Sequence, residues 1–403
     1  MPQSWVVCNL ADVCYFESGY AFSSDDYSQC GTPLVRISNI IDSRVSLESC
    51  VYINSECDKR FHVKKGDLLI AMSGATTGKK GVYDSDETAF LNQRVGNIKV
   101  IDGDVLLNDY RNIFMYSQID KILGLAYGGA QPNISANVIC SLAIPIPSIE
   151  EQKRIVIAVD QCFSLIDTLE TAKEDLQTTI AQAKSKILDL AIHGKLVPQD
   201  PNDEPAIELL KRINPKFTPC DNAHDTNHLP ESWCWATLGA LFQHNTGKAL
   251  NKSDSHEGTI QPYLTTSNVY WNSFDFTEVK QMYFKDSEME KCTVSKGDLL
   301  VCEGGDIGRA AIWNYDYNIC IQNHIHRLRA KQEVDQTLYL YVLMLYKWKD
   351  WIQGKGIGLQ GLSSGLLDKL VVPLPPYKEQ KRIISKIEEL FAVLDEIQKS
   401  IEV

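Results

Sequence analysis

Two stretches of the chain carry apolar residues alternately four and three positions apart. This spacing returns an apolar side chain to the same helix face every seven residues, which is the a/d pattern of a coiled coil. The first stretch follows a capping box, in which Ser148 can accept an amide hydrogen bond and Glu151 can reach back. The stripes comprise Ile155, Val159, Cys162, Ile166, Leu169, Leu176, Ile180, Ala183, Ile187 and Leu190 in the first stretch, and Ile383, Ile387, Leu390, Leu394, Ile397 and Ile401 in the second.

The two stripes predict long helices that pack on each other as an antiparallel coiled coil. A stripe of two positions in seven is narrow for a helix that packs only on its own domain, which is the alternative. A helix over 150–190 would be about 60 Å long at 1.5 Å per residue. Lys173 interrupts the first stripe, and His193 with Gly194 marks the end of its helix.

Outside these stretches the pattern changes to short apolar runs between clusters of Gly, Asn and Asp. Runs such as 68–71 and 299–302 are typical of strands bounded by turns. The mixture of such runs with helical segments predicts an α+β fold with a strongly bent sheet.

The chain also repeats itself at an offset of 228 to 231 residues. Ser4-Trp5 recurs at 232–233, 63–69 recurs at 294–300, and 151–155 recurs at 379–383. An offset that drifts by three and returns is what loop insertions produce between two copies of one fold. The predicted organisation is a domain over 1–147, a heptad helix over 148–195, a proline-rich connector over 196–228, a second domain over 229–375 and a second heptad helix over 376–403.

The composition, with 44% hydrophobic and 23% charged residues, is that of a globular protein. No apolar run approaches the roughly 20 residues of a membrane span, and the first residues lack the features of a secretory signal. The twelve cysteines are scattered, with none in a Cys-x-x-Cys pair, which is typical of free thiols in a reducing compartment. We therefore expect a cytoplasmic protein that contacts no membrane.

The net charge of −12 argues against a chain that binds nucleic acid by itself through charge. The acidic excess extends over both predicted domains and both helices. Any face for nucleic acid must therefore be a local patch.

Two mixed domains that alternate with two heptad helices resemble the specificity subunits of type I restriction–modification enzymes. The matching segments are Pro145 and Pro147 followed by 151–155, their twins at Pro373 and 379–383, the stretch 191–201, and the turns 66–69 and 297–300. The resemblance covers essentially the whole chain. The chain departs from it in the second helix, which stops at Val403, about 15 residues short of the first.

The resemblance implies a non-catalytic subunit that binds double-stranded DNA. Each recognition domain would read one half of a bipartite, asymmetric site, and the helices would set the spacing and dock methyltransferase subunits, two in number. Those subunits would methylate adenine with S-adenosylmethionine, and restriction subunits would join them for reactions driven by ATP and magnesium. This chain itself would bind no cofactor. The alternative function is a scaffold of two repeated domains that joins proteins and never contacts DNA.

The residues themselves also indicate a chain without catalytic motifs. A methyltransferase of amino groups needs Asn/Asp-Pro-Pro-aromatic, whereas the nearest stretch here is Asn214-Pro215-Lys216. The loop 74–79 resembles a phosphate loop, but it has three residues between its glycines instead of four. We interpret it and its twin 304–309 as loops that approach DNA phosphates, and the alternative is a solvated turn.

No metal site is expected. Two histidines, His324 and His326, share one face of a predicted strand, but two ligands are too few. Contact with a base or a phosphate, or surface exposure, is the preferred interpretation. Four further residues near the connector have an unusual spacing for zinc, namely Cys220, His224, His228 and Cys234.

Bases are read by bidentate side chains, with Arg suited to guanine and Asn or Gln to adenine. Such residues lie near the repeated motifs of both domains, together with basic and hydroxyl residues of the loops. The DNA-binding candidates are Arg36, Asn39, Thr76, Thr77, Lys79, Lys80, Asn92, Gln93, Arg94, Gln131 and Asn133 in the first domain, and Lys248, Asn268, Arg309, Gln322, Asn323, His324, His326, Lys355 and Gln360 in the second.

Overall fold

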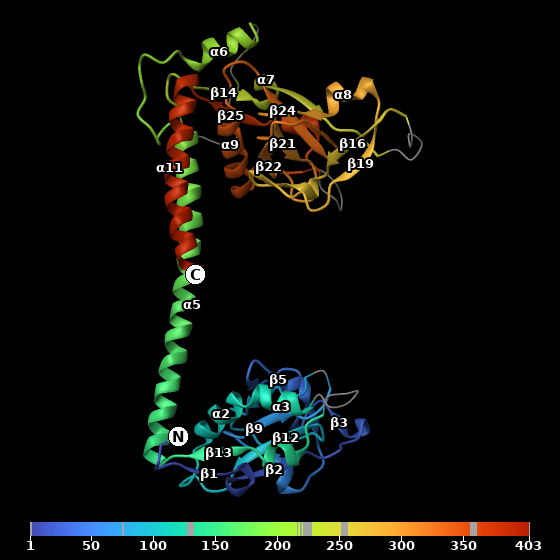
Figure 1. Ribbon diagram of the computed structural model, residues 1–403, viewed down its shortest axis with the longest axis vertical. Helices are drawn as coiled ribbons and strands as arrows, with labels where there is room; N and C mark the ends of the chain where they lie inside the picture. The colour runs from blue at the N-terminus through green and yellow to red at the C-terminus, as the bar shows by residue number, and fades with distance from the viewer. Residues whose placement is uncertain are drawn as a thin grey trace. The chain divides into compact units, whose positions relative to one another are not determined.

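The computed structural model describes residues 2–74, 76–126, 133–215, 217, 220, 228–250, 257–354 and 361–402. The chain divides into two compact units, Met1–Glu170 and Thr171–Val403 (Figure 1). The division falls within the long helix α5 (Ile149–Ile192). Each unit contains one mixed domain.

In the described part of the first unit, short strands and the α-helices α1 to α4 precede α5. These are β1 (Val6–Asn9), α1 (Leu10–Val13), β2 (Cys14–Ser18), β3 (Tyr27–Ser28), β4 (Thr32–Val35), β5 (Ile40–Ile41), β6 (Arg44–Val45), β7 (Val51–Ile53), β8 (His62–Val63), β9 (Leu68–Ala71), β10 (Lys80–Val82), β11 (Ala89–Leu91), β12 (Val95–Val100), α2 (Asn108–Ser117), α3 (Ile119–Ala126), α4 (Ala136–Cys140) and β13 (Ala143–Ile146). One sheet has the order β2-β12-β9-β10-β6-β5 and another the order β3-β7-β4-β11-β8. Strands β1 and β13 form an antiparallel pair.

The burial of strand β9 on both faces explains why the repeated turn is followed by an unbroken apolar run. All four of its residues are completely buried. Leu68 and Ile70 belong to a core cluster with residues of α2, α3 and α4, whereas Leu69 and Ala71 belong to a cluster with β4 and β11. Because successive side chains of a strand point to opposite faces, a strand covered on both sides needs apolar residues at every position.

The second unit repeats this plan. Its elements after α5 are α6 (Ala206–Ile213), β14 (Cys234–Thr237), α7 (Leu238–Leu241), β15 (Phe242–Thr246), β16 (Thr259–Leu264), β17 (Val269–Tyr270), β18 (Ser273–Phe274), β19 (Lys280–Phe284), α8 (Asp286–Cys292), β20 (Thr293–Val294), β21 (Leu299–Cys302), β22 (Ala310–Ile312), β23 (Ile319–Ile321), β24 (Ile325–Ala330), α9 (Gln336–Trp348), α10 (Ser364–Asp368), β25 (Val371–Leu374) and α11 (Tyr377–Ile401). The order β15-β24-β21-β22 matches β2-β12-β9-β10. The predicted α+β architecture with two similar domains and two long helices is confirmed.

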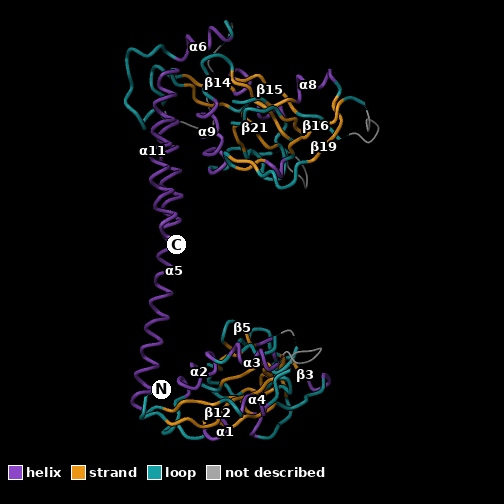
Figure 2. The backbone as a smooth tube through the Cα atoms, viewed as in Figure 1, coloured by secondary structure: helices purple, strands orange, loops and turns teal. Residues whose placement is uncertain are grey.

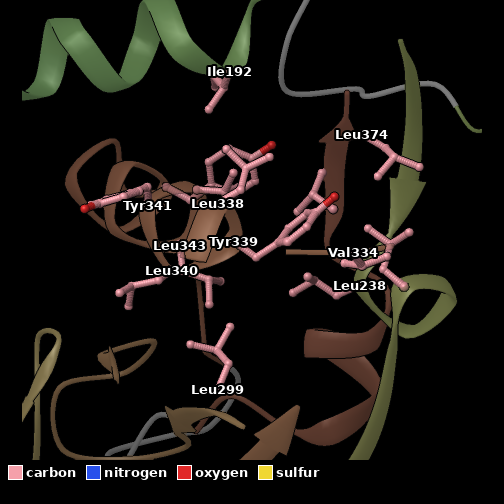
Figure 3. Close-up of a cluster of buried hydrophobic side chains, with 14 of the residues drawn as sticks. Ile192, Leu238, Leu299, Val334, Leu338, Tyr339, Leu340, Tyr341, Leu343 and Leu374 are labelled. Atoms are coloured by element: carbon pink, nitrogen blue, oxygen red, sulfur yellow. The ribbon is translucent and has the colours of Figure 1, made fainter. Parts of the chain in front are cut away.

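The end of α5 and helix α11 lie side by side in the second unit (Figures 1 and 2). Leu188 and Ile192 of α5 share one core cluster with Ile383 and Ile387 of α11. Lys184 Nζ forms an ion pair of 2.5 Å with Asp395 Oδ1. Since positions further along α5 meet positions earlier in α11, the pair is antiparallel, as predicted. Figure 3 shows Ile192 beside the aromatic and leucine side chains of α9.

The two apolar stripes that were expected to pack on each other are not buried along their whole length. Ile180, Ile383 and Ile387 are buried, and Leu176, Ile187, Leu190, Leu390, Leu394 and Ile401 are partly buried. Ile155 and Val159 are also partly buried, and Ile155 packs on the core of its own domain. By contrast, Ile166, Leu169 and Ile397 are 47%, 60% and 39% exposed. Helix α11 has 25 residues and α5 has 44, so α11 is too short to cover the whole stripe of α5.

A glutamine at the start of each long helix ties that helix to its domain. Gln152 Oε1 accepts a hydrogen bond from Leu107 N at 2.9 Å, and its Nε2 donates to the Pro147 carbonyl at 3.0 Å. In the second copy, Gln380 Oε1 accepts from Asp335 N at 2.9 Å, and its Nε2 donates to Pro375 at 3.0 Å. Both glutamines therefore satisfy the amide at the start of a domain helix, which accounts for their recurrence at an offset of 228.

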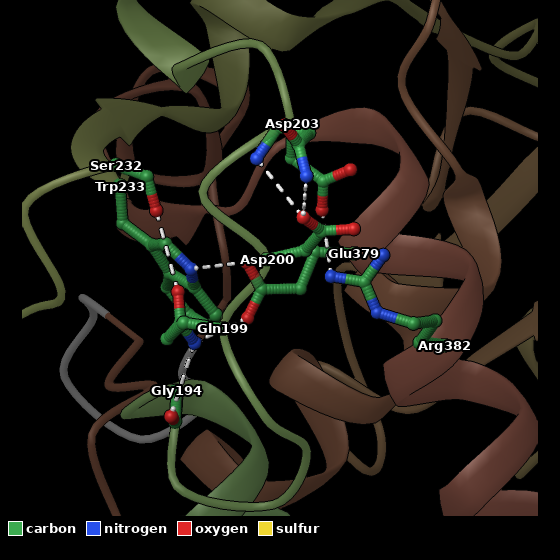
Figure 4. A network of polar contacts seen from close by, with 9 residues as sticks. Gly194, Gln199, Asp200, Asp203, Ser232, Trp233, Glu379 and Arg382 are labelled. Atoms are coloured by element: carbon green, nitrogen blue, oxygen red, sulfur yellow. Dashed lines mark hydrogen bonds and ion pairs between the residues drawn. The ribbon is translucent and has the colours of Figure 1, made fainter.

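The connector is fixed to α11 by a polar network in the second unit (Figure 4). The Glu379 carboxylate accepts hydrogen bonds from Gln199 Nε2 at 2.5 Å and Trp233 Nε1 at 2.9 Å. Arg382 Nη2 donates to Asp203 Oδ2 at 2.6 Å. Burial raises the pKa of the Glu379 carboxyl. The connector is therefore packed on the domain where the structure describes it.

Candidate nucleic-acid interface

Four loops of the first unit meet at one edge of its sheets. The turn 92–94 pairs with Tyr20 through an isolated bridge at Asn92. The Arg94 carbonyl accepts a hydrogen bond from Met72 N at 2.9 Å, and Ser73 forms a bridge with Asn133. This edge thus gathers the loops around 19–22, 72–79, 92–94 and 133, which we call the first reading edge.

The second unit has an equivalent edge. Lys248 pairs with Gln322 through an isolated bridge. Glu303 N donates to the His324 carbonyl at 2.9 Å, and Leu362 N donates to the Glu303 carbonyl at 2.8 Å. The loops around 247–250, 302–309, 322–324 and 361–362 form the second reading edge.

A repeated glycine permits the close approach of the backbones at each edge. A Cβ atom at Gly19 would lie 2.2 Å from the Asn92 carbonyl oxygen, and one at Gly247 would lie 2.0 Å from that of Ile321. Any side chain there would force the two loops apart. This constraint explains the recurrence of glycine at these positions.

The first reading edge exposes several of the predicted DNA-binding side chains. Lys79, Gln93, Arg94 and Asn133 are exposed, and Thr76 is partly buried. At the second edge His324 is exposed, and Gln322 and Asn323 are partly buried. A guanidinium and carboxamides can form the paired hydrogen bonds that distinguish guanine and adenine in the major groove.

Two predicted readers are instead committed to the backbone. Asn39 is 1% exposed, and its amide bonds the backbone of Arg36 at 2.9 Å and of Ser46 at 3.1 Å. Asn268 is 3% exposed and bonds Thr265 N at 2.8 Å and the Asp275 carbonyl at 2.9 Å. Their repeated role is to close a turn, so neither amide has an edge free for a base in this conformation.

Lys79, at the end of the loop 74–79, and Lys80, at the start of β10, differ in their exposure to solvent. Lys79 is exposed, whereas Lys80 is buried, and its ammonium has no hydrogen-bond partner among the described residues. Burial lowers the pKa of Lys80 to about 8. Thr77 is buried as well and donates to the Gly74 carbonyl at 2.6 Å. Only Lys79 of this group can reach a phosphate without a rearrangement.

Other candidates are bound within their domains. Lys248 is buried and pairs with Glu288 at 2.7 Å. Arg309 Nη2 donates to the Thr266 carbonyl at 2.6 Å, and its guanidinium lies 4.7 Å from the ring of Tyr270. Asn92 and His326 are buried, and Arg36 is partly buried. Three candidates, Gln131, Lys355 and Gln360, lie outside the described residues.

Selection by residue type missed Tyr20 at the first reading edge. Its side chain is 50% exposed. The ring lies 4.9 Å from that of Phe22 and 5.5 Å from that of Phe61, which restricts its orientation. Position 20 directly follows the repeated Gly19 and is the twin of Lys248, so the repeat itself contained the signal.

No metal centre is found in the part of the chain that the structure describes. No group of three or more His, Cys, Asp or Glu side chains there could hold an ion. Of the four residues considered for zinc, His224 is outside the described residues. Within the same described part, no helix is both long and apolar enough to cross a membrane.

An apolar groove of about 710 Å³ runs along the first half of α5 in the first unit. Ile113 and Tyr116 of α2 form one wall, and Val159, Phe163 and Ile166 of α5 form another. Phe163 is 61% exposed. Exposed apolar surfaces of this kind are typical of sites that bind protein partners.

The chain is similar over most of its length to known proteins of one family. The family model described as the type I restriction modification DNA specificity domain matches residues 2–178 and 230–403. The EcoBI specificity subunit of Escherichia coli is 24% identical over 99% of this chain and 81% of its own length. The EcoKI specificity subunit of Escherichia coli K12 is 22% identical over 100% and 85%.

Two solved structures share the fold. A chain from a study of complex assembly and conformational transition of the type I R-M system has 17% identity and a TM-score of 0.66, with 100% of this chain and 93% of that chain covered. The HsdS subunit of Thermoanaerobacter tengcongensis has 16% identity and a TM-score of 0.61, with 99% and 92% covered.

Proposed function

Because this chain belongs to the family of type I restriction modification DNA specificity domains, we propose that each of its two domains reads one half of a bipartite DNA site. The observation that carries this proposal is the duplicated reading edge. The same loops occur in both units, but the exposed turn contains Gln93 and Arg94 in one and Asn323 and His324 in the other. Two similar frames with different hydrogen-bonding groups favour a site whose halves differ.

The acidic net charge suggests that partner subunits, and not this chain, provide most of the attraction to DNA. A net charge of −12 gives little general attraction to DNA phosphates. We propose that methyltransferase subunits supply most of this attraction and that this chain selects the sequence. Specificity subunits of this family are non-catalytic, and the chemistry then belongs to the partners.

The apolar groove and the exposed stripe of α5 are the proposed docking surface for the methyltransferase subunits, two per chain. Phe163, Ile166 and Leu169 present apolar area that water disfavours. The partners would bring S-adenosylmethionine, and restriction subunits would bring ATP and magnesium to the same cytoplasmic complex. This chain would bind none of these cofactors itself.

A comparison of DNA binding with and without partners tests the function. The chain is mixed with DNA of random sequence and with DNA that carries the methylated site of its host, each with and without the methyltransferase subunits. We expect selective binding of the second DNA by the complex and weak binding by the chain alone. A complex that assembles but does not prefer the host site would favour the alternative, a protein scaffold without DNA binding.

A further inference from the structure

Three polar side chains of the second unit form a continuous chain of hydrogen bonds next to the second reading edge. Asp368 Oδ1 lies 2.7 Å from His244 Nδ1, and His244 Nε2 lies 2.9 Å from His326 Nδ1. His326 Nε2 in turn lies 2.7 Å from the Leu362 carbonyl oxygen. Both imidazoles are buried, with the His244 side chain 8% exposed and His326 fully enclosed.

The number of protons in this series of hydrogen bonds follows from its three contacts. Each contact needs one hydrogen between its two heavy atoms, and two neutral imidazoles carry only two hydrogens on nitrogen. The complete series of hydrogen bonds therefore requires one proton more than an ionised carboxylate and two neutral rings provide. With this third proton the three side chains have no net charge. Without it, one contact brings two lone pairs together inside the protein, which is unfavourable.

Burial indicates which ring carries the extra proton. It lowers the pKa of the His326 imidazole, which therefore remains neutral. A neutral His326 donates from Nε2 to the Leu362 carbonyl and accepts at Nδ1. His244 then donates at both nitrogens, to Asp368 and to His326. For a carboxylate on Asp368, whose side chain is 42% exposed to water, an imidazolium at His244 completes all three bonds.

In the first unit, the positions equivalent to the two histidines contain no titratable ring. Strand pairing places Phe16 and Gly96 at the positions of His244 and His326. Cys140, at the end of α4, is the twin of Asp368 at the end of α10. A Cβ atom at Gly96 would lie 2.3 Å from the Phe16 ring, so the ring occupies the space of a second side chain. The first domain thus serves as an internal control.

We propose that His244, His326 and Asp368 form a proton-dependent clasp that makes the second reading edge sensitive to pH. The proposal rests on the proposed function for its link to DNA, but the clasp itself can be tested without DNA. His326 binds the Leu362 carbonyl, and Leu362 N donates to the Glu303 carbonyl at 2.8 Å. Glu303 N donates to the His324 backbone carbonyl at 2.9 Å. Loss of the proton therefore loosens the segment at 361–363 and the turn that carries His324.

The charged groups around the clasp favour its positive charge. Asp368 faces it from α10, and Glu303 faces it from the turn after β21. Glu303 Oε2 also lies 3.1 Å from the exposed His324. Lys331 interacts electrostatically with Asp368, and its ammonium donates to the carbonyls of Gly239 and Ala240 at 3.2 and 2.8 Å. Helix α7, which contributes these carbonyls, has no charged side chain of its own.

The sign of the pH dependence follows from the proton count. In the unfolded chain a histidine loses its proton around pH 6.5. Above that pH the folded clasp binds more protons than the unfolded chain, so the free energy of unfolding decreases as the pH rises. The first domain has no equivalent group and should lack this dependence.

Nitrogen-15 NMR of the full chain labelled in its histidines tests the clasp directly. The signals are assigned with His244→Gln and His326→Gln. At pH 7 we expect a doubly protonated His244 and a His326 with its proton on Nε2, and both rings should change together as the pH is raised toward 9. Two neutral rings at pH 7, or two independent titrations, would overturn the proposal.

A variant that copies the first domain provides a second test. It combines His244→Phe, His326→Gly and Asp368→Cys. The wild-type free energy of unfolding should fall between pH 6.5 and 9 more steeply than that of the variant. His324→Gln, which changes an exposed histidine, should retain the wild-type slope. Parallel slopes for wild type and a folded triple variant would contradict the clasp, and NMR of the wild type decides if the variant does not fold.

The link to recognition is tested in the assembled complex. Methylation is compared on DNA with single base changes in either half-site between pH 6.5 and 9. We expect discrimination to decrease at higher pH only for the half read by the second domain. If the complex shows no sequence selection at all, the proposed function fails, and the NMR result still decides the clasp. Equal discrimination at every pH would overturn the link between clasp and reading edge.

Discussion

At the scale of the residue, the predicted DNA-binding side chains differ in what their polar groups already bind. Gln93, Arg94 and Asn133 are exposed at the first reading edge, whereas Asn39 uses its amide to close a turn. A buried amide that leaves its backbone partners loses hydrogen bonds of about 1 kcal/mol each. We therefore propose base reading for the first group.

Replacement of Arg94 by alanine should relax one base of the first half-site. A bidentate contact to a base contributes roughly 1–3 kcal/mol of discrimination, so about that much should be lost at one position. The measurement is methylation by the assembled complex on a set of singly substituted sites. The second half-site should be read as before.

Arg94→Lys is the matched control for charge. Lysine preserves the positive charge but lacks the planar fork of two donors. If Arg94 reads a base, Arg94→Lys should restore general DNA affinity without restoring discrimination. Full recovery of discrimination by lysine would show that the planar fork of Arg94 is not what reads the base.

Lys80→Met should stabilise the first domain at neutral pH. The pKa of Lys80 is lowered to about 8, so below that pH the folded domain contains a buried ammonium. We expect a gain of about 3 kcal/mol in the free energy of unfolding at pH 7, because each pKa unit between the unfolded and the folded value corresponds to about 1.4 kcal/mol. The gain should shrink as the pH rises from 8 toward the unfolded value of about 10.5, since the wild-type lysine is then neutral.

Lys79→Met is the control for this measurement in chemical unfolding experiments. Lys79 is exposed, so its replacement should change the stability by no more than about 0.5 kcal/mol at any pH. A Lys80→Met domain that is less stable than the wild type at pH 7 would show that the ammonium has a partner after all.

Sequence reasoning identified the reading turns but could not separate readers from turn-closing residues. Asn133 and Asn39 have the same side-chain chemistry, and only the folded turn decides that the first is exposed and the second buried. Tyr20 was missed for the opposite reason, because a tyrosine is not a typical bidentate reader. Hydrogen-bond partners and exposure are properties of the fold, not of residue type.

At the scale of the element, helix α5 has two different surroundings. Ile180 of the heptad stripe is buried in the second unit, while Ile166 and Leu169 of the same stripe are exposed in the first. The same heptad stripe thus supplies an internal contact and, in our proposal, a docking surface. The heptad spacing predicted the helix correctly, but periodicity specifies a stripe and not the partner that covers it.

Ile166→Asp should weaken the binding of the methyltransferase subunits. The side chain is 47% exposed, so a carboxylate there has little effect on folding of the chain alone. In a docked complex the same carboxylate would be buried without a partner, which is unfavourable by several kcal/mol. Co-purification and calorimetric titration with the methyltransferase subunit measure the effect.

Val105→Asp is the matched control for this experiment. Val105 is 45% exposed in the same unit but does not line the groove. It should leave the binding of the methyltransferase subunit unchanged. Equal effects of the two substitutions would argue against the groove as the docking surface.

At the scale of the whole molecule, α5 connects two domains that arose as copies of one fold. The sheets of the two units share the order β2-β12-β9-β10 and β15-β24-β21-β22. The repeat at 228 to 231 residues predicted this duplication from sequence, because strand and turn residues such as 66–69 and 297–300 are fixed by burial. The loops between them vary, and we propose that these loops encode the DNA target.

Insertion of one heptad near Leu169 should lengthen the spacer between the half-sites. Seven residues add about 10 Å of helix and keep the stripe in phase. At about 3.4 Å per base pair, the unspecified spacer should grow by up to roughly three base pairs. Sequencing of methylated sites provides the readout, and both half-sites should stay the same. An active insertion variant that methylates sites with the original spacer would show that α5 does not set the spacing.

The claim that each domain reads its own half-site is tested most directly by exchange of one domain. Residues 1–147 are replaced by the corresponding domain of another specificity subunit, and the sites methylated in a host that carries the complex are sequenced. We predict a new first half-site beside an unchanged second half-site. A change in both halves, or in neither, would contradict the account.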